Sequence, residues 1–342
     1  SIKRETQKPI RRILIPKETQ IRGREEELQR LRERFEEARG GSGRVALIEG
    51  EAGIGKTRLV DELVEALRKD DEPFHFLYGS YPPGGAATEA GAFSTAFREH
   101  FGDDDLEADL SRHLPETPGL VPAFAALLRG EAPPEGTAPL TKDLIQTAFV
   151  RTTRALAGDR PTIVLIDDLH FTSKEGRGLF AALAHASPEH RLLLIGTSRR
   201  GMAEDWIAGM QRLSHFSRLT LARLGEAEVR ILLEDVLSSK ALARDLAPRV
   251  AERSGGNPFF VFEIVQGFRD GGGLEQLPDG AWTTTANIRK FRVPTSVRDL
   301  LRSRIAALEE DERELIDVAA CCGYEFDASL VADALGLPRV PV

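Results

Sequence analysis

Short apolar runs alternate with longer segments of helical periodicity over the first two thirds of the chain. Successive apolar positions bounded by turn residues are typical of buried strands, whereas apolar residues three and four positions apart are typical of helices. Apolar runs that alternate with helices favour a parallel sheet covered on both faces. We therefore predict an α/β domain with strands at residues 45–48, 74–78, 161–168, 191–199 and 218–221 and helices at residues 24–39, 59–67, 144–156 and 178–185.

The rest of the chain has a different character. Residues 79–139 combine glycine, proline and acidic residues with short helical pieces, and from residue 226 onward the periodicity is helical, apart from a glycine-rich break and an irregular stretch through Trp282. Helices are expected at residues 226–237, 242–253, 258–269, 297–308, 310–322 and 328–335. We predict four parts: a linker or tail at residues 1–20, the α/β domain at 21–222, a helical domain at 223–290 and a last domain at 291–342.

Composition and charge exclude few classes of protein. The 342 residues are 41% hydrophobic and 29% charged, which suffices for a sizeable core without disulfides. The net charge of −8 argues against a surface dominated by nucleic-acid binding, and the basic residues among positions 1–20 are interpreted as part of a linker rather than a nucleic-acid arm. No apolar run approaches the ~18 residues of a membrane span, so we predict no membrane contact.

Cys321 and Cys322 are the two cysteines of the chain, and they stand next to each other. Neighbouring cysteines rarely pair, so no disulfide framework is possible and a reducing, cytoplasmic location is expected. Both are interpreted as small core residues of a helix. Because the chain begins at Ser1 without an apolar leader and ends just after a helical pattern, we expect it to be a piece of a longer protein.

The octapeptide Gly50-Glu51-Ala52-Gly53-Ile54-Gly55-Lys56-Thr57 matches the phosphate-binding loop pattern G-x-x-x-x-G-K-[ST]. It stands between an expected strand and an expected helix, where backbone N–H groups converge on a phosphate. The glycines permit positive φ and close backbone approach. We expect Lys56 to reach the β- and γ-phosphates and the Thr57 hydroxyl to ligate Mg²⁺, and we include Arg58 in the same nucleotide-binding segment.

Polar residues end two further apolar runs, at the sheet edge where ligands of parallel sheets bind. We assign Asp167 to the Mg²⁺ site and Asp168 to polarising or orienting the attacking water. Arg199 is expected to reach the γ-phosphate and so to distinguish ATP from ADP by a charge-assisted contact that ADP lacks. His170 could orient Asp168 or sense the γ-phosphate, and a packed, hydrogen-bonded histidine is an equally good interpretation.

Several short segments, in order along the chain, carry a family resemblance. They are Ile21-Arg22-Gly23-Arg24-Glu25, Asp167-Asp168-Leu169-His170-Phe171, Thr197-Ser198-Arg199, Ser254-Gly255-Gly256-Asn257-Pro258-Phe259-Phe260 and Val293-Pro294-Thr295-Ser296-Val297. Together with the phosphate loop they resemble the STAND class, the signal-transduction ATPases with numerous domains. The chain departs from that class in having Phe171 where tryptophan is usual and Thr172-Ser173 where Ala-Asp often follows.

The resemblance implies a P-loop NTPase sheet of AAA+ type, an all-α lid and the start of a winged-helix domain. It implies that Ile21, Arg22, Gly23 and Arg24 line the adenine site, and that Pro258, at the start of a lid helix, touches the base. It also implies an ADP-held closed state and an ATP-dependent open or oligomeric state. ATP or ADP and Mg²⁺ are therefore the expected cofactors, with self-association or domains outside this sequence as partners.

Three functions follow as hypotheses. The leading one is an ATP/ADP-binding switch with slow Mg²⁺-dependent hydrolysis, a regulatory module of a larger signalling or transcription-regulating protein. The second is an origin-recognition-type AAA+ ATPase that binds DNA, for which Asp-Glu would be expected in place of Asp167-Asp168. The third is a module that binds nucleotide structurally and never turns it over.

Overall fold

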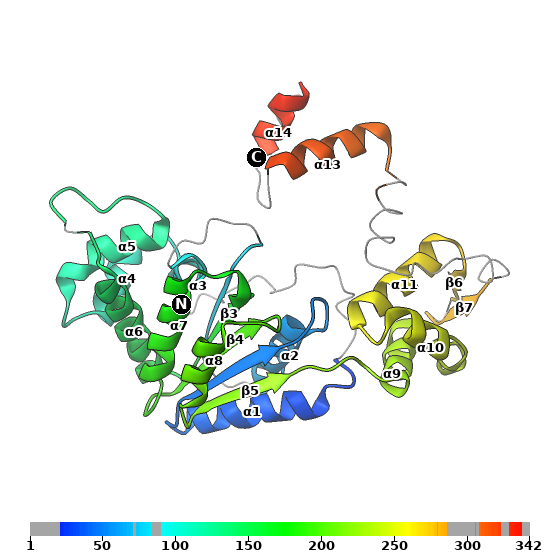
Figure 1. The fold of residues 1–342 in the computed structure, drawn as a ribbon, viewed down its shortest axis with the longest axis horizontal. Coiled ribbons are helices and arrows are strands. Elements are labelled where there is room, and N and C mark those ends of the chain that lie inside the picture. Colours follow the sequence, from blue (N-terminus) through cyan, green and yellow to red (C-terminus); the bar gives the residue numbers. More distant parts are fainter. Residues whose placement is uncertain are drawn as a thin grey trace. The chain divides into compact units, whose positions relative to one another are not determined.

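The computed structural model describes residues 21–70, 73–83, 90–137, 139–278, 280–285, 305, 308–322 and 328–336. The described chain divides into two compact units (Figure 1). The first contains residues 24–81 and 90–222, and the second contains residues 21–23, 82–83 and those from 223 onward. The expected linker at residues 1–20, the expected helix at residues 297–308 apart from its residues 305 and 308, and much of the expected winged helix lie outside the described residues.

A parallel sheet of five strands forms the centre of the first unit (Figure 1). Its strand order is β2-β3-β4-β1-β5, so that β1 lies between β4 and β5. Because all strands run in the same direction, the carboxyl ends of β1, β3 and β4 meet at one edge. The predicted parallel sheet is confirmed, with strands at β1 Arg44–Glu49, β2 His75–Ser80, β3 Thr162–Asp167, β4 Leu192–Ser198 and β5 Phe216–Thr220.

Helices cover both faces of this sheet. The strands β3 and β4 are buried at every position, as expected of a sheet with two covered faces. Alternate residues of three strands belong to one core cluster with side chains of α3 to α8: Val45, Leu47, Val164, Ile166, Leu192 and Leu194. The helix α1 contacts β1, β4 and α2. The helices are α1 Glu25–Arg39, α2 Lys56–Lys69, α3 Gly91–Phe101, α4 Leu106–His113, α5 Val121–Arg129, α6 Lys142–Asp159, α7 Lys174–Ala186 and α8 Glu204–Gln211.

The short helices α3 and α5 lie where the sequence indicated only helical pieces between glycine, proline and acidic residues. An aromatic cluster anchors them to α6. The ring of Phe149 on α6 meets Phe97 of α3 edge to face, with centroids 5.0 Å apart, and Phe124 of α5 at 4.9 Å. Aromatic pairs of this kind are worth about 0.5–1.5 kcal/mol beyond the area they bury. Tertiary packing therefore holds helices that are short and flanked by breakers.

The second unit contains the three consecutive helices that the periodicity predicts, α9 Glu226–Leu237, α10 Lys240–Ser254 and α11 Pro258–Asp270, around a core of their own. The predicted irregular stretch instead holds an antiparallel hairpin, β6 Leu274–Gln276 and β7 Trp282–Thr284. The Arg269 guanidinium lies over the Trp282 ring at 4.4 Å, and Leu274 is buried in the core. The hairpin therefore depends on contacts with α11 that no local pattern reveals.

The last described helices are α13 Glu310–Cys322 and α14 Ala328–Leu335, both at their predicted bounds. Cys321 and Cys322 lie in a helix as expected, but both are exposed thiols, so their interpretation as core residues is wrong. Ala319 is the buried residue of α13. Successive residues of a helix point about 100° apart, so the narrow buried side of α13 cannot include the two adjacent cysteines.

No helix in the described part of the chain is long and apolar enough to cross a membrane.

A cluster of rings at the end of α3 contains a buried histidine. The His100 ring lies 5.0 Å from the ring of His75 on β2 and 5.2 Å from that of Phe101. Its Nδ1 atom is buried and has no hydrogen-bond partner among the described residues. Burial, reinforced by the nearby His75 and His113, lowers the pKa of His100 to about 4. The folded chain therefore holds this imidazole neutral well below pH 6.5.

Acidification is expected to destabilise the first unit through His100. Below pH 6.5 the unfolded state binds a proton that the folded state does not, until the pH reaches about 4, so stability falls across this window. The loss is on the order of 2 to 3 kcal/mol. Denaturant unfolding between pH 7 and pH 4.5 measures it. His100→Gln should show a shallower fall, whereas the exposed His185→Gln should match the wild type; equal falls in all three proteins would contradict the assignment.

Candidate functional site

The phosphate loop connects β1 to α2 at the carboxyl edge of the sheet. Gly53 and Gly55 have φ angles of 74° and 100°, in the left-handed region that favours glycine. Gly55 caps α2, and its carbonyl accepts the N–H of Leu59 at 3.0 Å. The amides of Lys56 and Thr57 therefore precede the first intrahelical bond. Amides at a helix N-terminus favour an anionic ligand, and the helix dipole adds to this.

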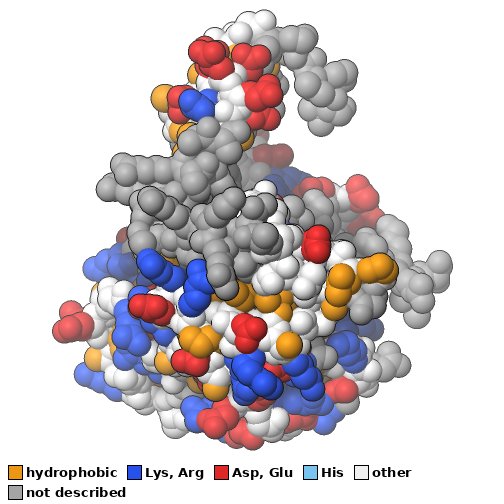
Figure 2. Space-filling view, turned by 90° about the vertical axis from the view of Figure 1, so that its right-hand side faces the viewer, with side chains coloured by type: hydrophobic (Ala, Val, Ile, Leu, Met, Phe, Trp, Pro, Cys, Tyr) orange, Lys and Arg blue, Asp and Glu red, His pale blue; other side chains and the backbone are white. Residues whose placement is uncertain are grey.

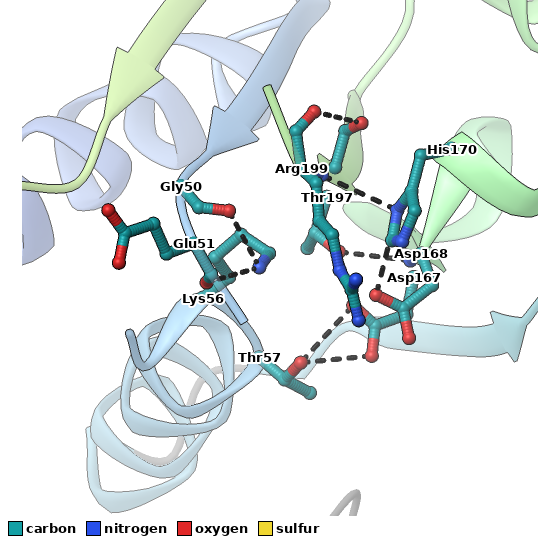
Figure 3. Close-up of polar contacts among 10 residues, drawn as sticks. Gly50, Glu51, Lys56, Thr57, Asp167, Asp168, His170, Thr197 and Arg199 are labelled. Carbon is teal, nitrogen blue, oxygen red and sulfur yellow. Dashed lines mark hydrogen bonds and ion pairs between the residues drawn. The ribbon is translucent and has the colours of Figure 1, made fainter. Parts of the chain in front are cut away.

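The Lys56 side chain is buried beside the loop. Its Nζ donates to the carbonyl oxygens of Gly50 at 3.1 Å and Glu51 at 3.0 Å (Figure 3). Burial lowers the pKa of Lys56, while the Asp168 and Asp167 carboxylates act in the opposite direction. These contacts keep the Lys56 ammonium at the loop, where its positive charge could bind a phosphate.

Asp167, the last residue of β3, accepts hydrogen bonds from two hydroxyl groups. Thr57 Oγ1 donates to its Oδ2 at 2.9 Å, and Thr197 Oγ1 donates to its Oδ1. Only 3% of Asp167 is exposed. Among the described residues there is no group of three or more His, Cys, Asp or Glu that could hold a metal ion. A carboxylate beside a hydroxyl does fit Mg²⁺, which takes few protein oxygens and keeps waters and phosphate oxygens as its other ligands.

Asp168 occupies a strained position. Its φ of 57° lies in the left-handed region, which is uncommon for a residue with a side chain and occurs preferentially at functional sites. The Asp168 N–H donates to Thr197 Oγ1 at 3.0 Å, so the Thr197 hydroxyl bridges the two adjacent aspartates. This bridging role was not predicted. The signal for it was a polar residue near the end of β4, the strand beside β3.

A second set of contacts joins Arg199 to the segment after Asp168. The Arg199 N–H donates to His170 Nδ1 at 3.4 Å, and the Arg199 guanidinium lies over the Phe171 ring at 5.7 Å. His170 Nδ1 is also 3.9 Å from Asp168 Oδ1. Burial and the positive charges of Arg199 and Lys56 lower the pKa of His170 to about 4, so the imidazole is neutral at pH 7. Figure 3 shows Arg199 between the loop and the Asp168–His170 segment.

Two of the predicted nucleotide ligands in the first unit are engaged with protein groups. Arg24 is 5% exposed, and its guanidinium donates to the Ala222 carbonyl and to Glu27. Arg58 pairs with the carboxylates of Asp61 at 3.2 Å and Glu62 at 2.7 Å. Their contacts with a nucleotide remain predictions.

The remaining predicted ligands lie in the second unit. Arg22 forms an ion pair with Asp235 of α9 at 2.6 Å. Gly23 has a φ of 69°, and an added Cβ there would lie 3.0 Å from Glu228 Cβ. Pro258 is the first residue of α11, and Asn257 caps that helix by accepting the Phe259 N–H at 3.1 Å. The contact of Ile21, Arg22, Gly23 and Pro258 with an adenine base remains a prediction.

A buried ion pair precedes the loop and was not predicted. Glu49, the last residue of β1, is 1% exposed, and its carboxylate receives the Arg218 guanidinium from the neighbouring strand β5. A backbone hydrogen bond also joins Glu49 to the residues after β5, because the Leu221 N–H donates to the Glu49 carbonyl at 2.8 Å. A charged residue at the end of an apolar run was the only signal in the sequence. The pair ties the start of the phosphate loop to the edge of the sheet.

Comparisons with known proteins place the chain among ATPases. Residues 20–195 match the family model of the AAA ATPase domain. The chain is 26% identical over 264 residues to an uncharacterised protein of Rhizobium meliloti, and the match covers 71% of this chain. It covers 24% of that protein, so the chain spans about a quarter of the length of the curated relative.

The chain also has a limited similarity to solved structures, of which three are named here. They are the Aeropyrum pernix ORC1 protein in complex with DNA (15% identity, TM-score 0.45, 94% of this chain and 80% of that one), a STAND protein with a tetratricopeptide repeat sensor from Pyrococcus horikoshii (15%, 0.48, 93% and 37%) and a Thermotoga maritima RuvB variant (16%, 0.40, 92% and 82%). At these identities and TM-scores no conclusion about this chain follows from them.

Proposed function

The chain belongs to the AAA ATPase domain family, and from this premise we propose that it is an ATP/ADP-binding switch that hydrolyses ATP slowly with Mg²⁺. The observation that carries the proposal is the convergence of three groups at one edge of the sheet. Lys56 lies beside the loop carbonyls, and the Thr57 hydroxyl bonds to the buried Asp167 carboxylate. A cation, helix N-terminal amides and a pair of oxygen ligands are what a nucleotide phosphate with Mg²⁺ requires.

Each residue has a distinct role in this proposal. Lys56 and the amides at the start of α2 bind the phosphates, and Thr57 and Asp167 would hold Mg²⁺. When bound, Mg²⁺ neutralises phosphate charge and polarises the phosphoryl oxygens. Asp168, whose side chain is 27% exposed, orients the attacking water and accepts its proton.

The switch rests on the difference between the two nucleotides. ADP and ATP share the loop contacts, but only ATP has a γ-phosphate that Arg199 and Asp168 could engage. A ligand shifts a conformational equilibrium only by its difference in affinity for the two states. We propose that the helices of the second unit act as a lid through Pro258 and that the ATP state favours self-association. The chain would then be the regulatory ATPase module of a larger protein.

DNA is not the partner that we propose. The net charge is −8, and acidic and basic side chains are interspersed on the face that Figure 2 shows. Proteins that neutralise many phosphates lose affinity steeply as salt rises. Tight, salt-dependent binding of a DNA duplex by the purified chain would favour the origin-recognition hypothesis instead.

Nucleotide binding by the purified wild-type chain tests the proposal directly. We expect bound ADP to be released on denaturation, and we expect calorimetry with Mg²⁺ to give different affinities for ATP and ADP. Slow release of phosphate from ATP should accompany binding. Binding of neither nucleotide would contradict the proposed site, and binding without any turnover would leave the module that holds nucleotide structurally.

A further inference from the structure

Arg199 is exposed at the end of β4, yet it is held at two points. Its backbone N–H donates to His170 Nδ1 at 3.4 Å, and the carbon of its guanidinium lies 5.7 Å from the centre of the Phe171 ring. A long side chain at an exposed position otherwise samples many rotamers. The first contact fixes the backbone from which the side chain extends, and the second limits the positions of the guanidinium.

The residues that hold Arg199 are themselves anchored. His170 and Phe171 lie in the short 3-10 helix η2 Leu169–Phe171, and their ring centroids are 4.0 Å apart. Leu169 is fully buried, and Phe171 packs against the same core cluster. The Phe171 N–H donates to the Asp168 carbonyl at 3.0 Å, which closes this turn. The ring that meets the guanidinium is therefore part of the sheet-edge structure and not of a free loop.

The same turn connects Asp168 and Arg199, the two residues that we assign to the γ-phosphate. His170 Nδ1, which accepts the Arg199 N–H, lies 3.9 Å from Asp168 Oδ1. An acceptor at Nδ1 requires that atom to be unprotonated, so the proton of the neutral ring is on Nε2. Nε2 is buried and has no hydrogen-bond partner in the described part of the chain.

We propose that Phe171, together with His170, is a positioning residue that holds the Arg199 guanidinium beside the phosphate loop, so that ATP affinity depends on Phe171 and ADP affinity does not. This inference rests on the proposed function, in which Arg199 contacts the γ-phosphate. ADP lacks that phosphate, and none of the contacts proposed for ADP involves Arg199. A ring that presents its face to a guanidinium attracts the cation electrostatically and limits its orientation.

The test compares ATP and ADP dissociation constants, measured with Mg²⁺ by calorimetry, for the wild type and five variants. Phe171→Leu keeps an apolar side chain but removes the ring, and it should weaken ATP binding about two- to fivefold, the size of an exposed cation–π contact. Its ADP affinity should not change. Phe171→Trp should restore ATP affinity, because tryptophan is the strongest ring for this contact.

Two further variants separate positioning from packing. Arg199→Ala should weaken ATP binding and leave ADP binding unchanged, and Phe171→Leu added to it should cause no further loss, as a coupled pair requires. The matched control is Phe101→Leu, because Phe101 is also partly buried against the core cluster and its ring contacts those of Phe97, His100 and His113. This control should bind both nucleotides as the wild type does.

The outcomes distinguish the inference from the function on which it rests. Equal weakening of ATP and ADP by Phe171→Leu, or a further loss in the Arg199→Ala background, would show a packing role and overturn the positioning role. An Arg199→Ala variant that kept the wild-type affinity for ATP would overturn it as well. A wild-type chain that bound neither nucleotide would instead contradict the proposed function itself.

Discussion

Lys56→Ala is expected to abolish nucleotide binding. The change removes the buried ammonium that bonds to the Gly50 and Glu51 carbonyls and that would pair with the phosphates. Hydrogen bonds to charged groups are worth about 1.5–3 kcal/mol each, so the loss of a phosphate contact together with the loop contacts should reduce affinity by at least about 100-fold. Calorimetric titration with ATP and with ADP in the presence of Mg²⁺ measures the effect.

Two companion variants show whether charge or packing is responsible. Lys56→Met keeps a long unbranched side chain without the charge, and it should lose binding as completely as alanine. Lys69→Ala changes an exposed lysine in the last turn of the same helix α2 and should bind as the wild type does. Micromolar ATP affinity retained by Lys56→Ala, in a protein that unfolds at the wild-type temperature, would refute the assignment of the phosphate loop.

Asp168→Asn is expected to keep nucleotide binding and to lose turnover. An amide has the size of the carboxylate but cannot accept a proton from water, and general-base catalysis contributes about 10²- to 10⁴-fold in rate. Asparagine fills the same space and tolerates the left-handed backbone of this partly exposed residue, so the fold should tolerate the change. Phosphate release under saturating ATP measures turnover, and calorimetry on the same sample measures affinity.

Asp167→Asn should have a different effect from its neighbour. Asp167 accepts the hydroxyls of Thr57 and Thr197, and an amide there would lose the charge that Mg²⁺ needs. We expect the Mg²⁺ enhancement of ATP affinity to disappear. The exposed Asp205→Asn serves as the control and should leave both properties unchanged. If Asp168→Asn were the variant that lost Mg²⁺-dependent binding, the division of roles between the two aspartates would be wrong.

Local periodicity was a good guide to the regular elements of this chain. Strands and long helices have residues whose burial follows from their own spacing, and the strands β3 and β4 were recognisable because each contains four successive apolar residues. The hairpin of β6 and β7 was not, because strands of three residues have no period to detect. It is stabilised by Trp282 against Arg269, which precedes it on α11.

The candidate site divides in the same way. The phosphate loop could be named from the sequence alone, because a loop that surrounds a phosphate is built from the amides of successive residues. The two adjacent carboxylates at the end of β3, Asp167 and Asp168, could be named in the same way. The roles of Thr197 as a bridge between the two aspartates, of Phe171 beneath the Arg199 guanidinium and of Arg218 on Glu49 could not.

The sequence by itself determined which segments form the sheet and where a phosphate-binding loop stands. Only the tertiary structure decided that β1 lies between β4 and β5. It also decided which side chains from separate strands meet at the carboxyl edge of the sheet. The reason is physical. Helical and strand periodicity and a glycine loop are properties of neighbouring residues. Strand order and side-chain contacts depend on packing between segments far apart in the chain, such as Glu49 and Arg218, which are 169 positions apart.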